Sequence, residues 1–195
     1  MTEAHRGLLQ QIETETPLTD EERRWIVAAF RPQTLKRKTF FLEAGQTCRF
    51  IAYLHEGVAR HFHLKDGREV TCDITLAGAF LTDMNSFANE TPSPYFFQTL
   101  QHSELLLVRK TDLRQLYQRS RAAETFGRIM AERVAQRSIQ TAMSLASETP
   151  EERVVNLLRD RPDLFQEVPQ RYLAHLVGIS PESFSRIRGR LAGKS

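Results

Sequence analysis

The sequence predicts an α+β fold in which an antiparallel β-roll is followed by a long helix and then by a helix-turn-helix domain. Three observations carry this prediction. Between residues 39 and 110, short apolar runs alternate with period two and are separated by turn sequences, a pattern typical of a small barrel or jelly roll. Residues 122–147 read as one uninterrupted helix, and residues 168–191 contain two apolar-periodic runs divided by a glycine turn.

The first 38 residues are predicted to be helical and amphipathic. Thr19 is followed by three acidic residues. This arrangement is typical of a helix start, because threonine caps free amide groups and acids complement the positive end of the helix dipole. Ile26 and Phe30 belong to the expected buried face, and Pro32 is expected to end the helix.

Six short runs are predicted to be the strands of the roll: residues 40–42, 50–54, 58–64, 69–74, 96–100 and 104–108. Asp66-Gly67 predicts a tight hairpin between two of them, because both residues accept the positive φ angles of a primed turn.

The segment between Phe80 and Tyr95 does not alternate, and an irregular insertion in a small barrel is where a ligand site is built. Its mixture of polar and apolar side chains predicts either an effector pocket or a loop that fills the space itself. The candidate pocket residues are Thr82, Asp83, Met84, Asn85, Ser86, Ser93 and Tyr95.

The predicted helix at residues 122–147 would be about 39 Å long at 1.5 Å per residue, longer than packing against a small barrel requires. Self-association is one use for the excess length. The side chains expected at a dimer interface recur near the coiled-coil spacing: Ala123, Phe126, Met130, Val134, Thr141 and Leu145. A helix packed wholly inside its own subunit is the alternative.

Two short helices with a tight turn are predicted at residues 168–191. Pro169 suits a first helical position, and Gly178 can enter the left-handed conformation that ends a helix. Ser180 is the expected N-cap of the second helix and Pro181 its first residue. Three side chains, Phe184, Ile187 and Leu191, are spaced to share one buried face.

The outward face of that second helix favours a reader of DNA. From residue 168 to 195 there are five cations, including Lys194, against the single carboxylate of Glu182, whereas the whole chain carries a net charge of only +3. Basicity concentrated on one short segment is typical of a protein that binds the phosphate backbone. The candidate DNA-binding residues are Arg171, Ser180, Pro181, Glu182, Ser183, Ser185, Arg186, Arg188 and Arg190.

Other classes of function find little support in the sequence. No apolar run is long enough to cross a bilayer and no signal-peptide pattern occurs, so a cytoplasmic location is expected. Phosphate loops, nucleophile elbows and zinc-binding helical motifs are absent from the sequence, and neither enzymatic activity nor a cofactor is expected. His61 and His63 share a strand face, but strand histidines on a solvated face are commoner than metal ligands, so no metal site is predicted.

The order of these parts resembles the Crp/Fnr family of bacterial transcription regulators. The most specific match is residues 180–186, SPESFSR, which look like the family's E-x-x-S-R reading pattern; residues 41–45 and 56–60 resemble its strand and turn pieces. The resemblance implies three parts: a cyclic-nucleotide-binding-like β-roll with N-terminal helices at 1–120, a dimerisation helix at 121–148 and a helix-turn-helix domain at 149–195. It also implies that Glu182, Ser185 and Arg186 contact base edges.

The expected protein is therefore a homodimeric regulator that binds double-stranded DNA, with RNA polymerase and an unknown small-molecule effector as further partners. Three departures from the family qualify this. The arginine that would pair with a cyclic phosphate is absent and Asp83 stands nearby, so cyclic AMP is not the expected effector. The cysteine cluster of oxygen sensors has no counterpart. Only four residues follow Leu191, so a complete wing is not expected. The alternative is a ligand-binding or protein-interaction β-roll whose degenerate C-terminal domain does not bind DNA.

Overall fold

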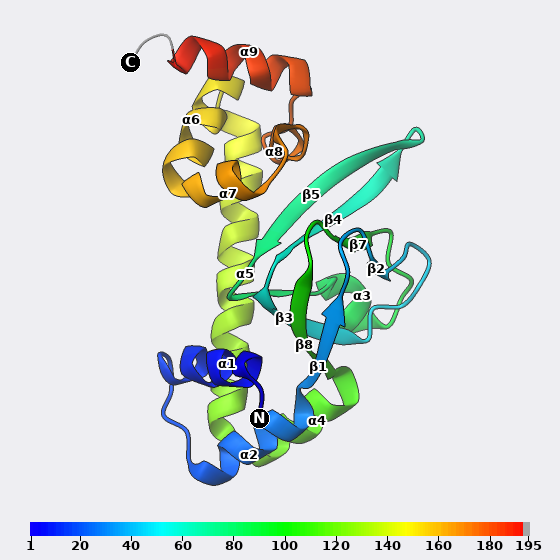
Figure 1. Ribbon diagram of the computed structural model, residues 1–195, viewed down its shortest axis with the longest axis vertical. Helices are drawn as coiled ribbons and strands as arrows, with labels where there is room; N and C mark the ends of the chain where they lie inside the picture. The colour runs from blue at the N-terminus through cyan, green and yellow to red at the C-terminus, as the bar shows by residue number, and fades with distance from the viewer. Residues whose placement is uncertain (193–195) are drawn as a thin grey trace.

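The computed structural model describes residues 1–192. Lys194 and the expected absence of a wing lie outside the described residues. Eight strands form two four-stranded antiparallel sheets, in the orders β1-β8-β3-β6 and β2-β7-β4-β5. The α+β class and the β-roll are confirmed (Figure 1). The strands are β1 Arg31–Leu35, β2 Phe40–Leu42, β3 Phe50–Glu56, β4 Val58–Lys65, β5 Arg68–Leu76, β6 Ala79–Leu81, β7 Phe96–Thr99 and β8 Ser103–Arg109.

The helices lie beside the roll and extend beyond it (Figure 1). They are α1 Glu3–Glu13, α2 Asp20–Ala29, α3 Met84–Asn89, α4 Lys110–Arg119, α5 Arg121–Ser147, α6 Pro150–Asp160, α7 Pro162–Glu167, α8 Gln170–Leu176 and α9 Pro181–Ala192. Helix α5 runs along the length of the molecule, with α1, α2 and α4 at one end and α6 to α9 at the other (Figure 1). The β4–β5 hairpin reaches from the roll toward the C-terminal helices, and β5 contacts α8.

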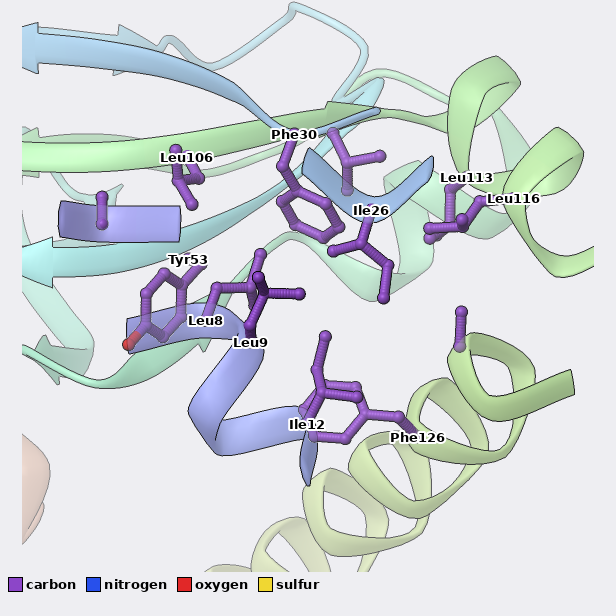
Figure 2. Close-up of a cluster of buried hydrophobic side chains, with 13 residues drawn as sticks. Leu8, Leu9, Ile12, Ile26, Phe30, Tyr53, Leu106, Leu113, Leu116 and Phe126 are labelled. Carbon is purple, nitrogen blue, oxygen red and sulfur yellow. The ribbon is translucent and has the colours of Figure 1, made fainter. Parts of the chain in front are cut away.

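The N-terminal helices form a core with α4, the start of α5 and one face of the β1-β8-β3-β6 sheet. Leu8, Ile26 and Leu106 are fully buried in it. Figure 2 shows Phe126 of α5 among the side chains of this cluster, close to Ile12 of α1. The first turns of α5 are therefore fixed by the chain's own core.

Gly127 allows α4 and α5 to approach each other closely. A Cβ atom at this position would lie within 2.6 Å of Cζ of Tyr117, in α4. We expect Gly127→Ala to destabilise the fold by about 1–3 kcal/mol through overpacking, although alanine is the better helix former. Urea denaturation measures the change. Gly189→Ala is the matched control: nothing lies within 4 Å of its Cβ position, so it should stabilise α9 by up to about 1 kcal/mol. Equal effects of the two substitutions would contradict the packing argument.

The structure corrects the prediction that residues 1–38 are helical, because β1 follows α2 directly. Pro32 ends the helix as expected but lies in a strand. A proline is tolerated there because β1 is an edge strand, paired only with β8, so no second partner requires its missing N–H group. The irregular segment between Phe80 and Tyr95 likewise contains regular structure, since β6 ends in it at Leu81 and the short helix α3 lies within it.

The turns between strands and helices follow the predictions closely. Asp66 and Gly67 adopt φ angles of 52° and 73°, which confirms the hairpin between β4 and β5. Gly178 has a φ angle of 69° at the end of α8, where a residue with a side chain would be strained. Helix α8 begins at Gln170, one residue later than predicted, with Pro169 at its N-cap.

Candidate functional site

Helix α9 presents the predicted reading face to solvent. Phe184 and Ile187 are 0% and 7% exposed and anchor the opposite face in the C-terminal core. Glu182, Ser185 and Arg186 are exposed, and their spacing puts them on one side of the helix. The Ser180 hydroxyl accepts the Ser183 N–H at 3.2 Å, so the predicted N-cap is confirmed.

The predicted DNA-binding arginines differ in the contacts that their side chains already make within the chain. Arg186 donates to the Ser183 hydroxyl at 3.2 Å, a neutral partner that leaves its positive charge free. Arg190 forms an ion pair with Glu151 at 2.9 Å. Arg171 lies over the Tyr172 ring and donates to its hydroxyl at 3.0 Å. Arg186 is therefore better placed than Arg171 to meet an incoming ligand.

Gly189 belongs to the same exposed face and was not among the predicted site residues. It lies one turn beyond Ser185 and Arg186, and nothing surrounds its Cβ position within 4 Å. Packing therefore gives no reason for a glycine in the interior of this helix. The sequence could have pointed to Gly189 through its position four residues after Ser185, on the same face of the helix. A glycine at such a position lets another backbone approach closely, because it has no side chain.

The C-terminal helices are docked on the β4–β5 hairpin through a buried arginine. Arg60, 2% exposed, has its guanidinium 4.0 Å from the ring centroid of Phe62 and 4.4 Å from that of Tyr172 in α8. It donates to Gln98 and pairs with Glu69 at 2.6 Å. On the same side, Val58 and Ile74 join the C-terminal core. These contacts were not predicted, because the sequence does not indicate which face of a hairpin a distant domain covers.

His175 makes a further contact between the C-terminal helices and the β4–β5 hairpin. Nδ1 of His175, in α8, accepts the backbone N–H of Thr71, in β5, at 3.1 Å. Burial lowers the pKa of His175, and the positive charge of Arg60 lowers it further, with Glu69 opposing. A protonated ring cannot accept this hydrogen bond at Nδ1, so the docked arrangement requires neutral His175.

Acidification should therefore weaken docking. Because the folded-state pKa of His175 lies below the ordinary value of 6.5, its contribution to stability is present above pH 6.5 and is lost as pH falls through the folded-state pKa. We expect the urea midpoint to fall more between about pH 7.5 and pH 5.5 in the native protein than in His175→Gln, whose amide oxygen can still accept. Identical pH dependence in both proteins would contradict this assignment.

A groove with a volume of about 1630 Å³ runs between the β-roll and α5. His61, Asp73 and Thr82 line it from the roll, and Arg137 and Thr141 from the helix. Arg137 spans the groove to reach Asp73 at 2.7 Å. Burial lowers the pKa of His61, while the charges of Asp73 and Asp83 act in the opposite direction.

The predicted pocket segment is largely occupied with its own hydrogen bonds. The Asp83 carboxylate caps α3 by accepting the N–H groups of Asn85 and Ser86 at 3.1 and 3.2 Å. Ser86 donates to a carbonyl of its own loop, and Ser93 accepts the Tyr95 N–H at 3.1 Å. Thr82 and Met84 line the groove. Among the described residues, Asp83 Oδ2 is buried without a hydrogen-bond partner.

The residues of the predicted dimer interface fall into two groups in the structure, one in the N-terminal core and one along the groove. Ala123 and Phe126 are only 5% and 6% exposed and belong to the chain's own N-terminal core, and Met130 packs against that core. These residues therefore do not form a free surface, because the first turns of α5 are covered by the chain's own N-terminal helices.

The rest of the predicted interface shares the side of α5 that faces the chain itself. Val134, Thr141 and Leu145 all line the groove, as does Arg137. The opposite side carries two more exposed apolar residues, Ile139 and Met143, at 60% and 64%. This second stripe was not predicted, because the sequence does not indicate which side of α5 the roll covers.

Within residues 1–192, no cluster of three or more His, Cys, Asp or Glu side chains is arranged to hold a metal ion. No helix in the described part of the chain has the length and apolar character needed to cross a membrane.

Comparison with known proteins agrees with this architecture. Residues 32–120 match the cyclic nucleotide-binding domain family. No curated protein sequence matches the chain significantly. Among solved structures, the c-di-GMP responsive global regulator CLP of Xanthomonas campestris is 21% identical, with a TM-score of 0.67 over 90% of this chain and 93% of its own.

Two further structures extend the comparison. A CooA variant from Carboxydothermus hydrogenoformans is 14% identical, with a TM-score of 0.72 over 96% of this chain and 84% of its own. A protein from Eubacterium rectale, described as a regulator of the Crp/Fnr family, is 14% identical, with a TM-score of 0.67 over 91% and 85%. Residues 32–120 are thus similar to the cyclic nucleotide-binding domain family, in a chain that has the Crp/Fnr fold over nearly its whole length.

Proposed function

We propose that the protein is a homodimeric, sequence-specific DNA-binding regulator of transcription. The observation that carries this proposal is the exposed face of α9, where Glu182, Ser185 and Arg186 lie together on a well-anchored helix. Arginine can bind guanine O6 and N7 bidentately, and glutamate can accept from a cytosine amino group. The proteins of similar fold support the proposal, since one is described as a global regulator of gene expression.

Dimerisation would use the side of α5 that faces away from the roll. Ala135, Ile139, Met143 and Ala146 recur there every three or four residues, and all are exposed. This spacing fits a two-stranded coiled coil. A symmetric pair formed on this seam would present two copies of α9 to DNA. The two copies would meet successive major grooves, which lie about 34 Å apart on one face of DNA.

The groove between the roll and α5 is the proposed effector site, because it lies beside the docked β4–β5 hairpin. His61 and Asp73 face the groove, whereas Arg60 and Ile74 contact the C-terminal helices from the neighbouring positions. Alternate residues of one strand point to opposite faces. A ligand that moves the hairpin would therefore disturb the docking of α8.

Cyclic AMP is not expected to occupy this groove by phosphate pairing. Ser93 and Pro94 stand where the family has its phosphate-binding arginine, and the amide groups at the start of α3 already bind the Asp83 carboxylate. We expect calorimetric titration with cyclic AMP to give no saturable heat at micromolar concentrations. Saturable micromolar binding that is lost in Thr82→Ala would contradict this prediction.

Chromatin immunoprecipitation with sequencing tests the proposed function as a whole. Enrichment of discrete sites that share a common sequence motif, lost in Arg186→Ala, is the expected result. Absence of discrete sites would favour the alternative, a β-roll whose C-terminal helices serve only as a structural cover. Sites near promoters would also support RNA polymerase as the partner implied by the resemblance.

A further inference from the structure

A second groove, separate from the one along α5, lies at the α4 end of the β-roll. Its volume is about 700 Å³, within the range of roughly 300–1,000 Å³ of small-molecule pockets. Pro32, Phe50 and Leu107 supply apolar surface. The cationic residues of its lining come from four elements or their flanks: Arg31, Arg49, Arg109, Lys110 and Arg114.

Among these five cations, only Lys110 is paired with a carboxylate in the described part of the chain. Lys110 pairs with Glu90 at 2.9 Å, donates to the Ala88 carbonyl and lies over the Phe87 ring. The hydrogen bond from Lys110 holds the pKa of Glu90 below its usual value, and the nearby charges of Lys110, Arg114 and Arg49 act in the same direction. Several guanidinium groups therefore surround a single carboxylate.

The four arginines of the groove have no ion pair or side-chain hydrogen bond within the described part of the chain. They are also exposed. Like charges gathered at one place repel one another. The positive end of the α4 dipole adds to this repulsion, because α4 begins at Lys110 without a side-chain cap. An anionic ligand would relieve it.

DNA bound at α9 does not account for these charges. Helices α4 and α9 lie at opposite ends of α5 (Figure 1), and no residue lines both this groove and the groove along α5. The cluster is thus separate from both sites of the proposed function, and its charges do not depend on that function.

We propose that this second groove binds a small ligand carrying at least two phosphate groups. Guanidinium groups bind phosphate oxygens bidentately, and four of them can engage more than one phosphate. The apolar surface of Phe50 and Leu107 can take an uncharged part of such a ligand. The volume of the groove favours a small molecule over an acidic polypeptide, which would need a longer surface.

Calorimetric titration of the full chain with inorganic pyrophosphate tests the proposal, and Arg49→Ala/Arg114→Ala is the informative variant. We expect saturable one-to-one binding that weakens at least about tenfold in the variant, because each charge-assisted hydrogen bond contributes on that scale. Added salt should weaken binding further, since the groups are exposed. The matched control is Arg24→Ala/Arg68→Ala, which removes two exposed arginines elsewhere and should leave affinity unchanged.

Three outcomes would overturn the proposal: no saturable binding, equal loss in both double variants, or binding of polyglutamate but not of pyrophosphate. Equal urea midpoints of the two variants establish that any loss is not due to unfolding. Because the titration contains no DNA, its failure is distinguishable from failure of the proposed regulatory function.

Discussion

Arg186→Ala is expected to lose specific DNA binding while retaining the native fold. The side chain is exposed on α9, and within residues 1–192 its hydrogen bond is to the Ser183 hydroxyl alone, so removing it leaves no buried charge unpaired. A bidentate arginine–guanine contact contributes about 1–3 kcal/mol of discrimination. A dimer loses this contact in both half-sites, so specific affinity should fall by roughly a hundredfold or more.

Gel mobility shift with a fragment recovered by immunoprecipitation measures this loss. Arg24→Ala is the control, since Arg24 is exposed on α2, and α2 and α9 lie at opposite ends of α5 (Figure 1). The control should bind as tightly as the native protein. Equal retardation of all three proteins would contradict a reading role for Arg186.

Ile139→Glu/Met143→Glu is expected to separate the dimer into monomers. These two side chains are the most exposed large apolar residues of α5, and burying a large apolar side chain contributes about 1.5–3 kcal/mol. Replacing both with carboxylates in each protomer also places like charges along the seam. The dimer dissociation constant should therefore rise more than about a hundredfold, and DNA affinity should fall with it.

Sedimentation velocity distinguishes the two possible seams of α5. Val134→Glu/Leu145→Glu is the matched control, because these residues are exposed to a similar degree but lie on the side that faces the roll and the C-terminal helices. We expect the control to remain a dimer. A monomeric control with a dimeric Ile139/Met143 variant would place the interface on the seam predicted from the sequence instead.

The parts of the fold set by local chemistry were predictable from the sequence. The Asp66-Gly67 hairpin, the Gly178 turn and the Ser180 cap each depend on a few adjacent residues, and the structure has all three. The outward face of α9 follows from helical periodicity in the same way, because Phe184 and Ile187 fix the buried side.

Features that depend on contacts between distant segments were not predictable. Residues Ala123 and Phe126 fit a coiled-coil spacing, but the N-terminal helices cover them. Arg60 appeared in the sequence only as the end of the strand piece at residues 56–60, and His175 carried no signal, because their contacts arise only where β4 and β5 meet α8. The cationic groove is likewise assembled from segments that begin at residue 31 and end at residue 114.

Selection of binding sites from random DNA tests the central claim most directly, because it asks whether two copies of α9 read DNA together. We predict that the native protein enriches a palindromic pair of half-sites whose centres lie about 10 base pairs apart, and that Arg186→Ala enriches none. No enrichment by the native protein, or enrichment of a single unrepeated half-site, would contradict the account of a paired reader.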